Sequence, residues 1–154
     1  MARLKFLVDS NVVIDYLSCR KPFFEQARLL MTCGRVGEFD LWITASQATD
    51  ILYVISNGAR KSELPTARQR MRAFCQFVHV IDVQSQDVLA MLSSDWADAE
   101  DALIYEVAAR IHADAIVTRN QTDFEAKGVR VLNCEELFAW VRQEQGVDYS
   151  EMDV

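Results

Sequence analysis

The sequence predicts an α/β fold, a three-layer α/β/α sandwich with a mainly parallel central sheet. Short apolar segments of strand length alternate with amphipathic helical segments along the whole chain, which is typical of a parallel sheet covered by helices. The 154 residues, 51% of them hydrophobic and 25% charged, suffice for one domain with its own core. Because the chain has only five glycines and two prolines and shows no repeat or linker, we expect a single domain.

The expected strands are short apolar runs. The clearest is Leu4–Val8, which is interrupted only by Lys5 and therefore suits a strand buried on both faces of a parallel sheet. The other expected strands are Leu41–Thr44, Phe77–Val83, Ala115–Thr118 and Val129–Leu132.

The expected helices carry apolar residues at a spacing of three and four. In the helix expected over Asp98–His112, an inward stripe is formed by Ile104, Val107, Ala108 and Ile111. Pro65 suits the first turn of a further helix, which contains most of a basic segment. The remaining expected helices are Asn11–Leu17, Phe23–Val36, Ser46–Ile55, Ser85–Leu92 and Cys134–Arg142.

Composition excludes several classes of protein. No apolar run approaches the roughly 18 residues of a membrane span, and the first residues lack the apolar segment of a signal peptide. We therefore expect a cytoplasmic protein without membrane contact. The four cysteines are scattered and there are only two histidines, so neither a zinc site nor a disulfide is expected. We interpret the cysteines as small buried apolar residues.

The formal net charge of −7 argues against a protein that binds nucleic acid through overall charge. Part of this acidity lies in residues 144–154, which we separate as an acidic C-terminal tail from a domain over residues 1–143. The tail contains Glu144, Asp148, Glu151 and Asp153 and no basic residue. By contrast, the segment 60–72 holds five basic residues and one acidic residue. Arg68 and Arg70 in this segment are candidates for steering RNA, although a solvated helix face is the alternative.

Acidic residues recur where the predicted strands end or helices begin. They are Asp9 after the first strand, Asp50 within the helix Ser46–Ile55, Asp98 and Asp101 at a helix start, and Asp123 after a later strand. Each also has a structural interpretation: a helix cap for Asp9 and Asp98, a hydrogen bond to Ser46 for Asp50, and a first helical turn for Asp123. Asp101 is spaced to face inward, which capping does not explain.

Together these positions indicate a metal site. In parallel α/β folds, ligands bind at the carboxyl ends of the strands, where all four acidic groups are expected. Crowded carboxylates repel one another, and a hard cation such as Mg²⁺ or Mn²⁺ relieves that repulsion. Carboxylate clusters that hold such ions act on phosphate esters.

Three segments, LVDSNVVIDYL, TASQATDILYVI and DAEDALIYEVAARIHADAIVTRNQTDF, resemble the PIN-domain nucleases, specifically the bacterial VapC-like toxin branch. The resemblance runs from about Arg3 to Trp140. It implies a metal-dependent endoribonuclease that leaves 5′-phosphate and 3′-hydroxyl ends. The implied catalytic residues are Asp9, Asp50, Asp101 and Asp123. The resemblance implies that Asp9 and Asp101 bind Mg²⁺ or Mn²⁺ and that Asp123 and Asp50 complete the shell directly or through water. Asp98 is a further candidate ligand, and either Asp98 or Glu100 could supply the extra acid.

The same resemblance assigns further roles. Thr118 and Asn120 match the polar positions of a T-x-N turn that lines the site, and we add Asn11 as a third candidate substrate contact. Asp50 stands where the family usually has the longer Glu, and Glu100 is a further acid beside Asp101. The implied partners are an RNA substrate, a cognate antitoxin protein and a second copy of the chain in a homodimer.

Three other functions remain open on the sequence. A haloacid-dehalogenase-like phosphatase would need an acid two residues after Asp9, where this chain has Asn11. A receiver-type phosphoacceptor domain needs a lysine near its last strand, and only Lys127 lies in that part of the chain. The third alternative is a catalytically degenerate PIN-like domain that binds RNA or protein without cutting.

Overall fold

The computed structural model describes residues 2–124, 128–149 and 152. Its core is a five-stranded parallel sheet with the strand order β3-β2-β1-β4-β5. The strands are β1 (Leu4–Val8), β2 (Phe39–Thr44), β3 (Val78–Ile81), β4 (Ala115–Val117) and β5 (Arg130–Leu132). The predicted α/β/α sandwich with a parallel sheet is thus confirmed.

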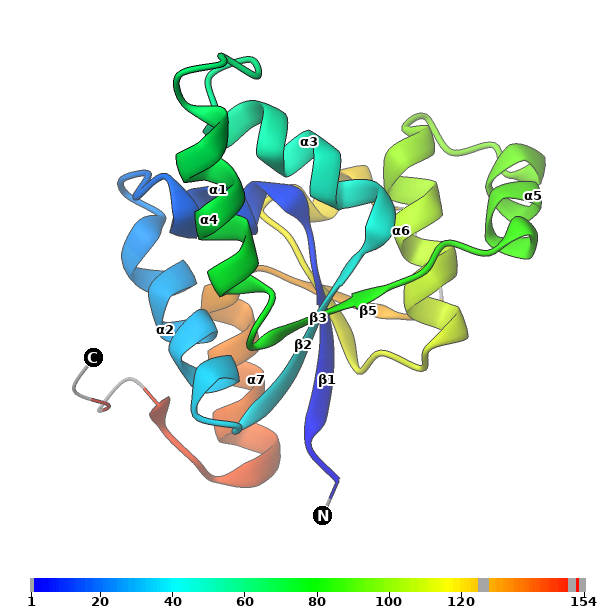
Figure 1. Ribbon diagram of the computed structural model, residues 1–154. Coiled ribbons are helices and arrows are strands. Elements are labelled where there is room, and N and C mark those ends of the chain that lie inside the picture. The colour runs from blue at the N-terminus through cyan, green and yellow to red at the C-terminus, as the bar shows by residue number, and fades with distance from the viewer. Residues whose placement is uncertain (1, 125–127, 150–151, 153–154) are drawn as a thin grey trace.

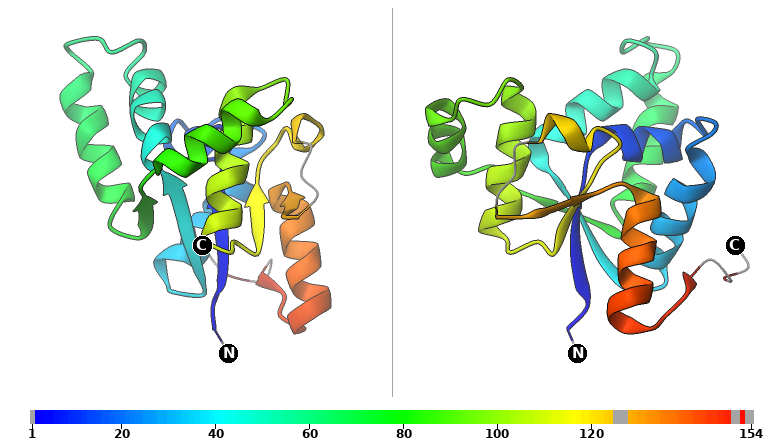
Figure 2. Two further views of the ribbon diagram at one scale, coloured as in Figure 1. Left: turned by 90° about the vertical axis from the view of Figure 1, so that its right-hand side faces the viewer. Right: turned by 180° about the vertical axis from the view of Figure 1, so that it is seen from behind.

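Helices cover both faces of the sheet, as Figure 1 shows. They are α1 (Ser10–Leu17), α2 (Phe24–Arg35), α3 (Ala45–Ile55), α4 (Leu64–Phe74), α5 (Ser85–Ser93), α6 (Ala99–Arg110) and α7 (Cys134–Gln145), with a 3₁₀ turn η1 (Gln121–Asp123). In the rear view of Figure 2, α6 and α7 lie on opposite sides of the sheet.

Successive side chains of β1 point to opposite faces of the sheet and so contribute to two separate core clusters. Phe6 and Val8 join the larger cluster, to which α1, α2 and α7 contribute, whereas Leu7 points to the other face and packs with Ile104 and Ala108 of α6. All three β1 residues are fully buried. A strand buried on both faces explains the nearly continuous apolar run in its sequence.

Most elements begin or end one to three residues away from the bounds that the sequence predicts. Three of these differences lie in β3, β4 and α7. The strand expected over Phe77–Val83 is only Val78–Ile81, and β4 stops at Val117, so that Thr118 lies in the turn beyond it. Helix α7 continues past Arg142 to Gln145, where Gly146 ends it in a left-handed conformation with φ of 67°. Glycine adopts that conformation without the steric cost of a β-carbon.

The cysteine interpretation was half wrong. Cys33 and Cys134 are buried, and burial raises the pKa of each thiol to about 12. Cys19 and Cys75 are exposed instead, because each lies in a connecting segment just after a helix. All four thiols are free.

The segment after α7 returns to the core. Tyr149 is 8% exposed; its ring packs against Phe39 and Phe138, and its hydroxyl donates a 2.9 Å hydrogen bond to Glu38. Glu151 and Asp153 of the expected acidic tail lie outside the described residues. Among the helices that the structure describes, none has the length and apolar character needed to cross a bilayer.

Candidate active site

Asp9 lies at the carboxyl end of β1 and is the N-cap of α1, so a helix start and a strand end meet at one carboxylate. The residue is 7% exposed. Its Oδ1 accepts the N–H of Ser10 at 2.7 Å, and its Oδ2 accepts the hydroxyl of Thr118 at 2.7 Å and the amide of Asn11 at 3.3 Å. Since Oδ2 takes two of these bonds and Oδ1 one, Oδ1 keeps more capacity for a further ligand.

The electrostatic surroundings of Asp9 disfavour its charge. Burial raises the pKa of this carboxyl above its ordinary value, and the nearby charge of Asp98 adds to the rise. Hydrogen bonds from Thr118 and Ser10, together with the charge of Arg119, lower the pKa of Asp9 but do not cancel the rise. A cation at this position would stabilise the ionised form.

The turn after β4 contributes polar atoms around Asp9. Thr118 is fully buried, and its Oγ1 accepts the N–H of Asn120 at 3.1 Å and the amide of Asn11 at 3.3 Å while its hydroxyl donates to Asp9. The N–H of Arg119 is 3.3 Å from Asn11 Oδ1. The structure thus brings Asn11 and Thr118 to Asp9, and Asn120 to Thr118, at the end of the sheet where η1 and α1 also lie (Figure 2).

The start of α6 brings acids to the same end of the sheet. Asp98 is the N-cap of α6, and its carboxylate accepts the N–H of Asp101 at 3.0 Å, so the capping interpretation of Asp98 is confirmed. Its charge nevertheless reaches Asp9. Partial burial raises the pKa of Glu100, and the charges of Asp50, Asp9 and Asp98, in that order, raise it further. These four acids therefore form one electrostatic group.

Asp50 lies on α3 and is exposed. The expected hydrogen bond from Ser46 is not what the structure shows, because the Ser46 hydroxyl lies 2.7 Å from Oγ1 of Thr44. Asp50 therefore joins the acidic group through its charge, which acts on Glu100.

Asp123 ends η1, but its side chain lies outside what the structure describes, as does Lys127. Among the described residues, no three His, Cys, Asp or Glu side chains form a ready-made cation site. The donor chemistry still fits a hard cation, because the acidic group offers carboxylate oxygens and Asp9 Oδ1 keeps a lone pair.

Comparison with known proteins decides the family. The family model described as PIN domain matches residues 5–122. The chain belongs to the PIN domain family. No curated protein matches the sequence significantly.

Solved structures share the fold of this PIN domain at low sequence identity. DNA-bound VapBC from Salmonella typhimurium has a TM-score of 0.65 and 18% identity, covering 85% of this chain and 98% of that one. A toxin-antitoxin complex from Klebsiella pneumoniae has a TM-score of 0.59 and 20% identity, covering 83% and 96%. VapC20 of Mycobacterium tuberculosis, a toxin that cleaves the sarcin-ricin loop, has a TM-score of 0.56 and 9% identity, covering 72% and 86%. The fold is that of the VapC toxins.

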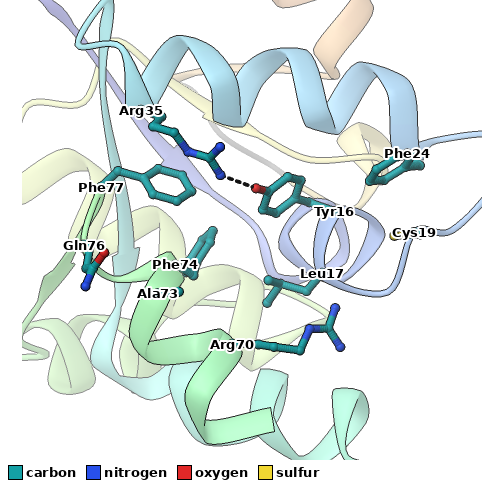
Figure 3. Close-up of a pocket in the computed structure, with 10 residues that line it drawn as sticks. All are labelled: Tyr16, Leu17, Cys19, Phe24, Arg35, Arg70, Ala73, Phe74, Gln76 and Phe77. Carbon is teal, nitrogen blue, oxygen red and sulfur yellow. Dashed lines mark hydrogen bonds between the residues drawn. The ribbon is translucent and has the colours of Figure 1, made fainter. Parts of the chain in front are cut away.

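The two basic candidates of the PIN domain lie on α4. Arg68 is exposed, and Arg70 lines a cavity of about 610 Å³ between α1, α2 and α4 (Figure 3). The other lining residues are Tyr16, Leu17, Cys19, Phe24, Arg35, Ala73, Phe74, Gln76 and Phe77. None of the acidic group lines this cavity, so the cavity that Arg70 lines is a different feature from the candidate active site.

Sequence reasoning missed two supports of the PIN-domain site. Gln47 is fully buried; its side chain accepts the N–H of Thr44 and donates to the carbonyl of Val8 at 2.9 Å and to Ser10 Oγ at 3.1 Å. The spacing of Thr44 and Gln47 is that of a capping box, a signal that the sequence does carry. The second support is the ion pair of Arg119 with Asp15, 104 positions apart in sequence, which no local pattern indicates.

Proposed function

We propose that this PIN domain is a metal-dependent endoribonuclease and the toxin of a type II toxin-antitoxin pair in the cytoplasm. The observation that carries the proposal is the buried Asp9 carboxylate, held by Thr118 and Asn11 within reach of the charges of Asp98 and Glu100. A carboxylate placed at such electrostatic cost is typical of a functional site.

Asp9, Asp98, Asp101 and Asp123 are the residues that would hold Mg²⁺ or Mn²⁺. Asp50 and Glu100, the other two members of the acidic group, would act on the site through their charge. The bound cation would supply Lewis-acid stabilisation of the scissile phosphate and a water of lowered pKa. Thr118 and Asn11 orient the Asp9 carboxylate, because both donate to its Oδ2. Asn120, two residues after Thr118 in the same turn, is exposed and is the proposed RNA contact.

The phosphatase alternative loses support from the same geometry. Its general acid would stand at residue 11, where the Asn11 amide donates to Asp9 and to Thr118. A carboxamide does not deliver a proton as a general acid. The degenerate-domain alternative differs from the proposal only in activity, and the experiment below separates the two.

The proposed antitoxin fits the cavity between α1, α2 and α4. Leu17, Phe24, Phe74 and Phe77 give it an apolar lining, whereas Arg35 and Arg70 supply positive charge (Figure 3). These features favour an apolar peptide segment that carries acidic residues. Support for such a partner also comes from the structural neighbours, several of which are toxin-antitoxin complexes.

A homodimer is part of the same proposal. Leu89 and Leu92 on α5 are 63% and 68% exposed, and Tyr53 on α3 is 60% exposed. Leu89 and Leu92 are three residues apart and so share one face of α5, and exposed apolar side chains gathered on one face are typical of an interface. Light scattering of the purified chain would give twice 17.6 kDa if the dimer forms, and the monomer mass would contradict it.

The activity is tested by incubating the purified protein with a mixed RNA pool in Mg²⁺, in Mn²⁺ and in EDTA. Asp101→Asn is the test variant, and Asp40→Asn is the matched control, because Asp40 lies on β2 and pairs with Arg3 outside the acidic group. We expect cleavage that needs the metal, disappears in Asp101→Asn and persists in Asp40→Asn. Mass spectrometry beforehand checks that no antitoxin has copurified.

Other outcomes contradict the proposal in different ways. Cleavage that survives in Asp101→Asn would assign the activity to other residues or to a contaminant. A wild type that binds Mn²⁺ in a calorimetric titration but cuts no RNA, even free of antitoxin, would favour the binding-only domain. A wild type that neither cuts RNA nor binds Mn²⁺ would end the enzymatic interpretation.

A further inference from the structure

We infer that Arg119 and Asp15 form a positioning pair that fixes the turn after β4 against α1 and thereby sets the orientation of the Asp9 carboxylate. This inference deepens the proposed function and rests on it for the role of Asp9. Neither residue belongs to the acidic group itself. Arg119 and Asp15 are instead the groups through which α1 and the turn hold each other.

Arg119 neutralises the charge of the deeply buried Asp15 carboxylate. The side chain of Asp15 is 1% exposed, and a carboxylate so deeply buried is unfavourable unless it is paired. Arg119 Nε lies 2.6 Å from Asp15 Oδ2, and Nη2 lies 3.2 Å from Oδ1, a two-pronged contact. The guanidinium also stacks over the ring of Phe23 at 4.1 Å. Three contacts therefore fix the position of the Arg119 side chain.

The backbone of Arg119 connects this anchor to the site. Arg119 is the middle residue of the turn, between Thr118, whose hydroxyl donates to Asp9, and Asn120, whose N–H donates to Thr118 Oγ1. Its own N–H donates to Asn11 Oδ1 while the amide of Asn11 donates to Asp9. Both side-chain donors to Asp9 Oδ2 are thus held by this turn.

Helix geometry explains why Arg119 contacts two residues of α1 that are one turn apart. Asn11 and Asp15 are four residues apart in α1 and therefore lie on the same face of the helix. Arg119 meets Asn11 with its backbone and Asp15 with its side chain. Without the side-chain anchor, the turn should stay attached to α1 and Asp9 only through the Thr118 hydroxyl and the backbone N–H of Arg119.

A second buried ion pair provides the matched control. Asp87, whose side chain is 4% exposed, pairs with Arg110 at 2.9 Å and joins α5 to α6. Neither Asp87 nor Arg110 contacts Asp9 or the turn after β4 in the described residues. Removing this pair should therefore cost the stability that any buried ion pair contributes, while leaving the Arg119–Asp15 pair and the turn after β4 unchanged.

The experiment compares Asp15→Leu/Arg119→Met with Asp87→Leu/Arg110→Met. Replacing both members of a buried pair by apolar residues of similar size commonly preserves folding, whereas removing one member leaves a buried charge. Two quantities are measured on the metal-free protein: hydrogen exchange of the Ser10, Arg119 and Asn120 amides by NMR, and Mn²⁺ affinity by calorimetry.

We expect the Asp15/Arg119 variant to lose exchange protection at these three amides and to bind Mn²⁺ roughly 10–100-fold more weakly, the range seen when partners of metal ligands are removed. The control variant should keep the wild-type values of both. Arg119→Lys, which keeps the charge opposite Asp15 but not the two-pronged contact, should fall between wild type and the double variant, and it serves as the test if the double variant does not fold.

Three results would overturn the inference. They are unchanged protection of the turn amides, reduced protection with unchanged Mn²⁺ affinity, and equal reductions in the control variant. Failure of the proposed function looks different, because wild type itself would then bind no Mn²⁺. In that case the exchange comparison alone decides whether Arg119 and Asp15 hold the turn.

Discussion

The hydroxyl of Thr118 donates a 2.7 Å hydrogen bond to Oδ2 of Asp9, joining two residues that are 109 positions apart in the sequence. Strands β1 and β4 are neighbours in the sheet, so the residues that follow them emerge side by side. Asp9 ends β1 and caps α1, whereas Thr118 begins the turn that leads to η1. The order of strands in the sheet therefore creates the first contact of the candidate active site.

Removal of this hydroxyl should weaken metal binding. Thr118→Val preserves shape but removes the donor, and because the hydrogen bond from Thr118 lowers the pKa of Asp9, that pKa should rise further. We expect Mn²⁺ affinity, measured by calorimetry, to fall about 10-fold or more. Thr32→Val is the control, since the Thr32 hydroxyl bonds only within α2, to the carbonyl of Arg28. Equal affinities of Thr118→Val and wild type would show that the hydroxyl does not orient a ligand.

The acidic group should make the metal-free protein less stable as pH rises. Glu100 has a pKa raised above its ordinary 4.5 by burial and by Asp50, Asp9 and Asp98. A raised acid pKa means that stability is fully present below pH 4.5 and is lost as pH rises through the folded-state pKa.

Glu100→Gln stays neutral, so its unfolding temperature in EDTA should exceed that of wild type by a margin that grows as pH rises above 4.5. Differential scanning fluorimetry measures this margin, and Glu106→Gln further along α6 controls for removing a charge from the helix. Saturating Mn²⁺ should reduce the margin, because a bound cation relieves the same repulsion. A margin independent of pH would contradict the clustering of these charges.

The buried amide of Gln47 should matter for folding more than for chemistry. Gln47→Met keeps the volume but leaves the N–H of Thr44 and the carbonyl of Val8 without this partner. Each buried group left unsatisfied costs about 1–3 kcal/mol, which urea unfolding should detect as a lower midpoint. Gln26→Met on the exposed side of α2 should stay within about 0.5 kcal/mol of wild type. Similar midpoints for both variants would remove Gln47 as a support.

The basic helix α4 offers a test of RNA steering. In an Asp101→Asn background, Arg68→Glu/Arg70→Glu should bind RNA more weakly, and the slope of log affinity against log salt should flatten by about 0.7 for each phosphate that these arginines no longer neutralise. Arg28→Glu/Arg142→Glu changes the net charge equally at surface ion pairs elsewhere. Filter binding at several salt concentrations measures both. Equal slopes in the two double variants would show that Arg68 and Arg70 belong to a solvated helix face and do not steer RNA.

Local patterns in the sequence were enough to predict most of the fold. The apolar run Leu4–Val8 predicts β1 because both faces of a central parallel strand are buried, and the stripe through Ile104 and Ala108 predicts α6 because that face packs on the sheet. The ends of elements were predicted less well. Thr118 was predicted as the last residue of β4, yet β4 ends at Val117, and the Thr118 side chain hydrogen-bonds Asp9 and the N–H of Asn120 in the turn that follows.

The sequence was enough to identify candidate site residues whose side-chain type and position after a strand already indicate their chemistry. An acid directly after a buried strand marked Asp9, and the structure places Asp98 and Glu100 within reach of its charge. By itself, then, the sequence determined the parallel α/β/α architecture and an acidic edge of the sheet, since hydrophobic periodicity and strand ends are local features.

The tertiary structure alone decided which groups hold that edge in place. It paired Asp15 with Arg119, buried Gln47 between β1 and β2, placed Arg70 in a cavity between α1, α2 and α4, and returned Tyr149 to the core. Each of these contacts joins elements whose proximity depends on strand order and helix packing. Such proximity is a property of the assembled sheet, and no spacing within a single segment encodes it.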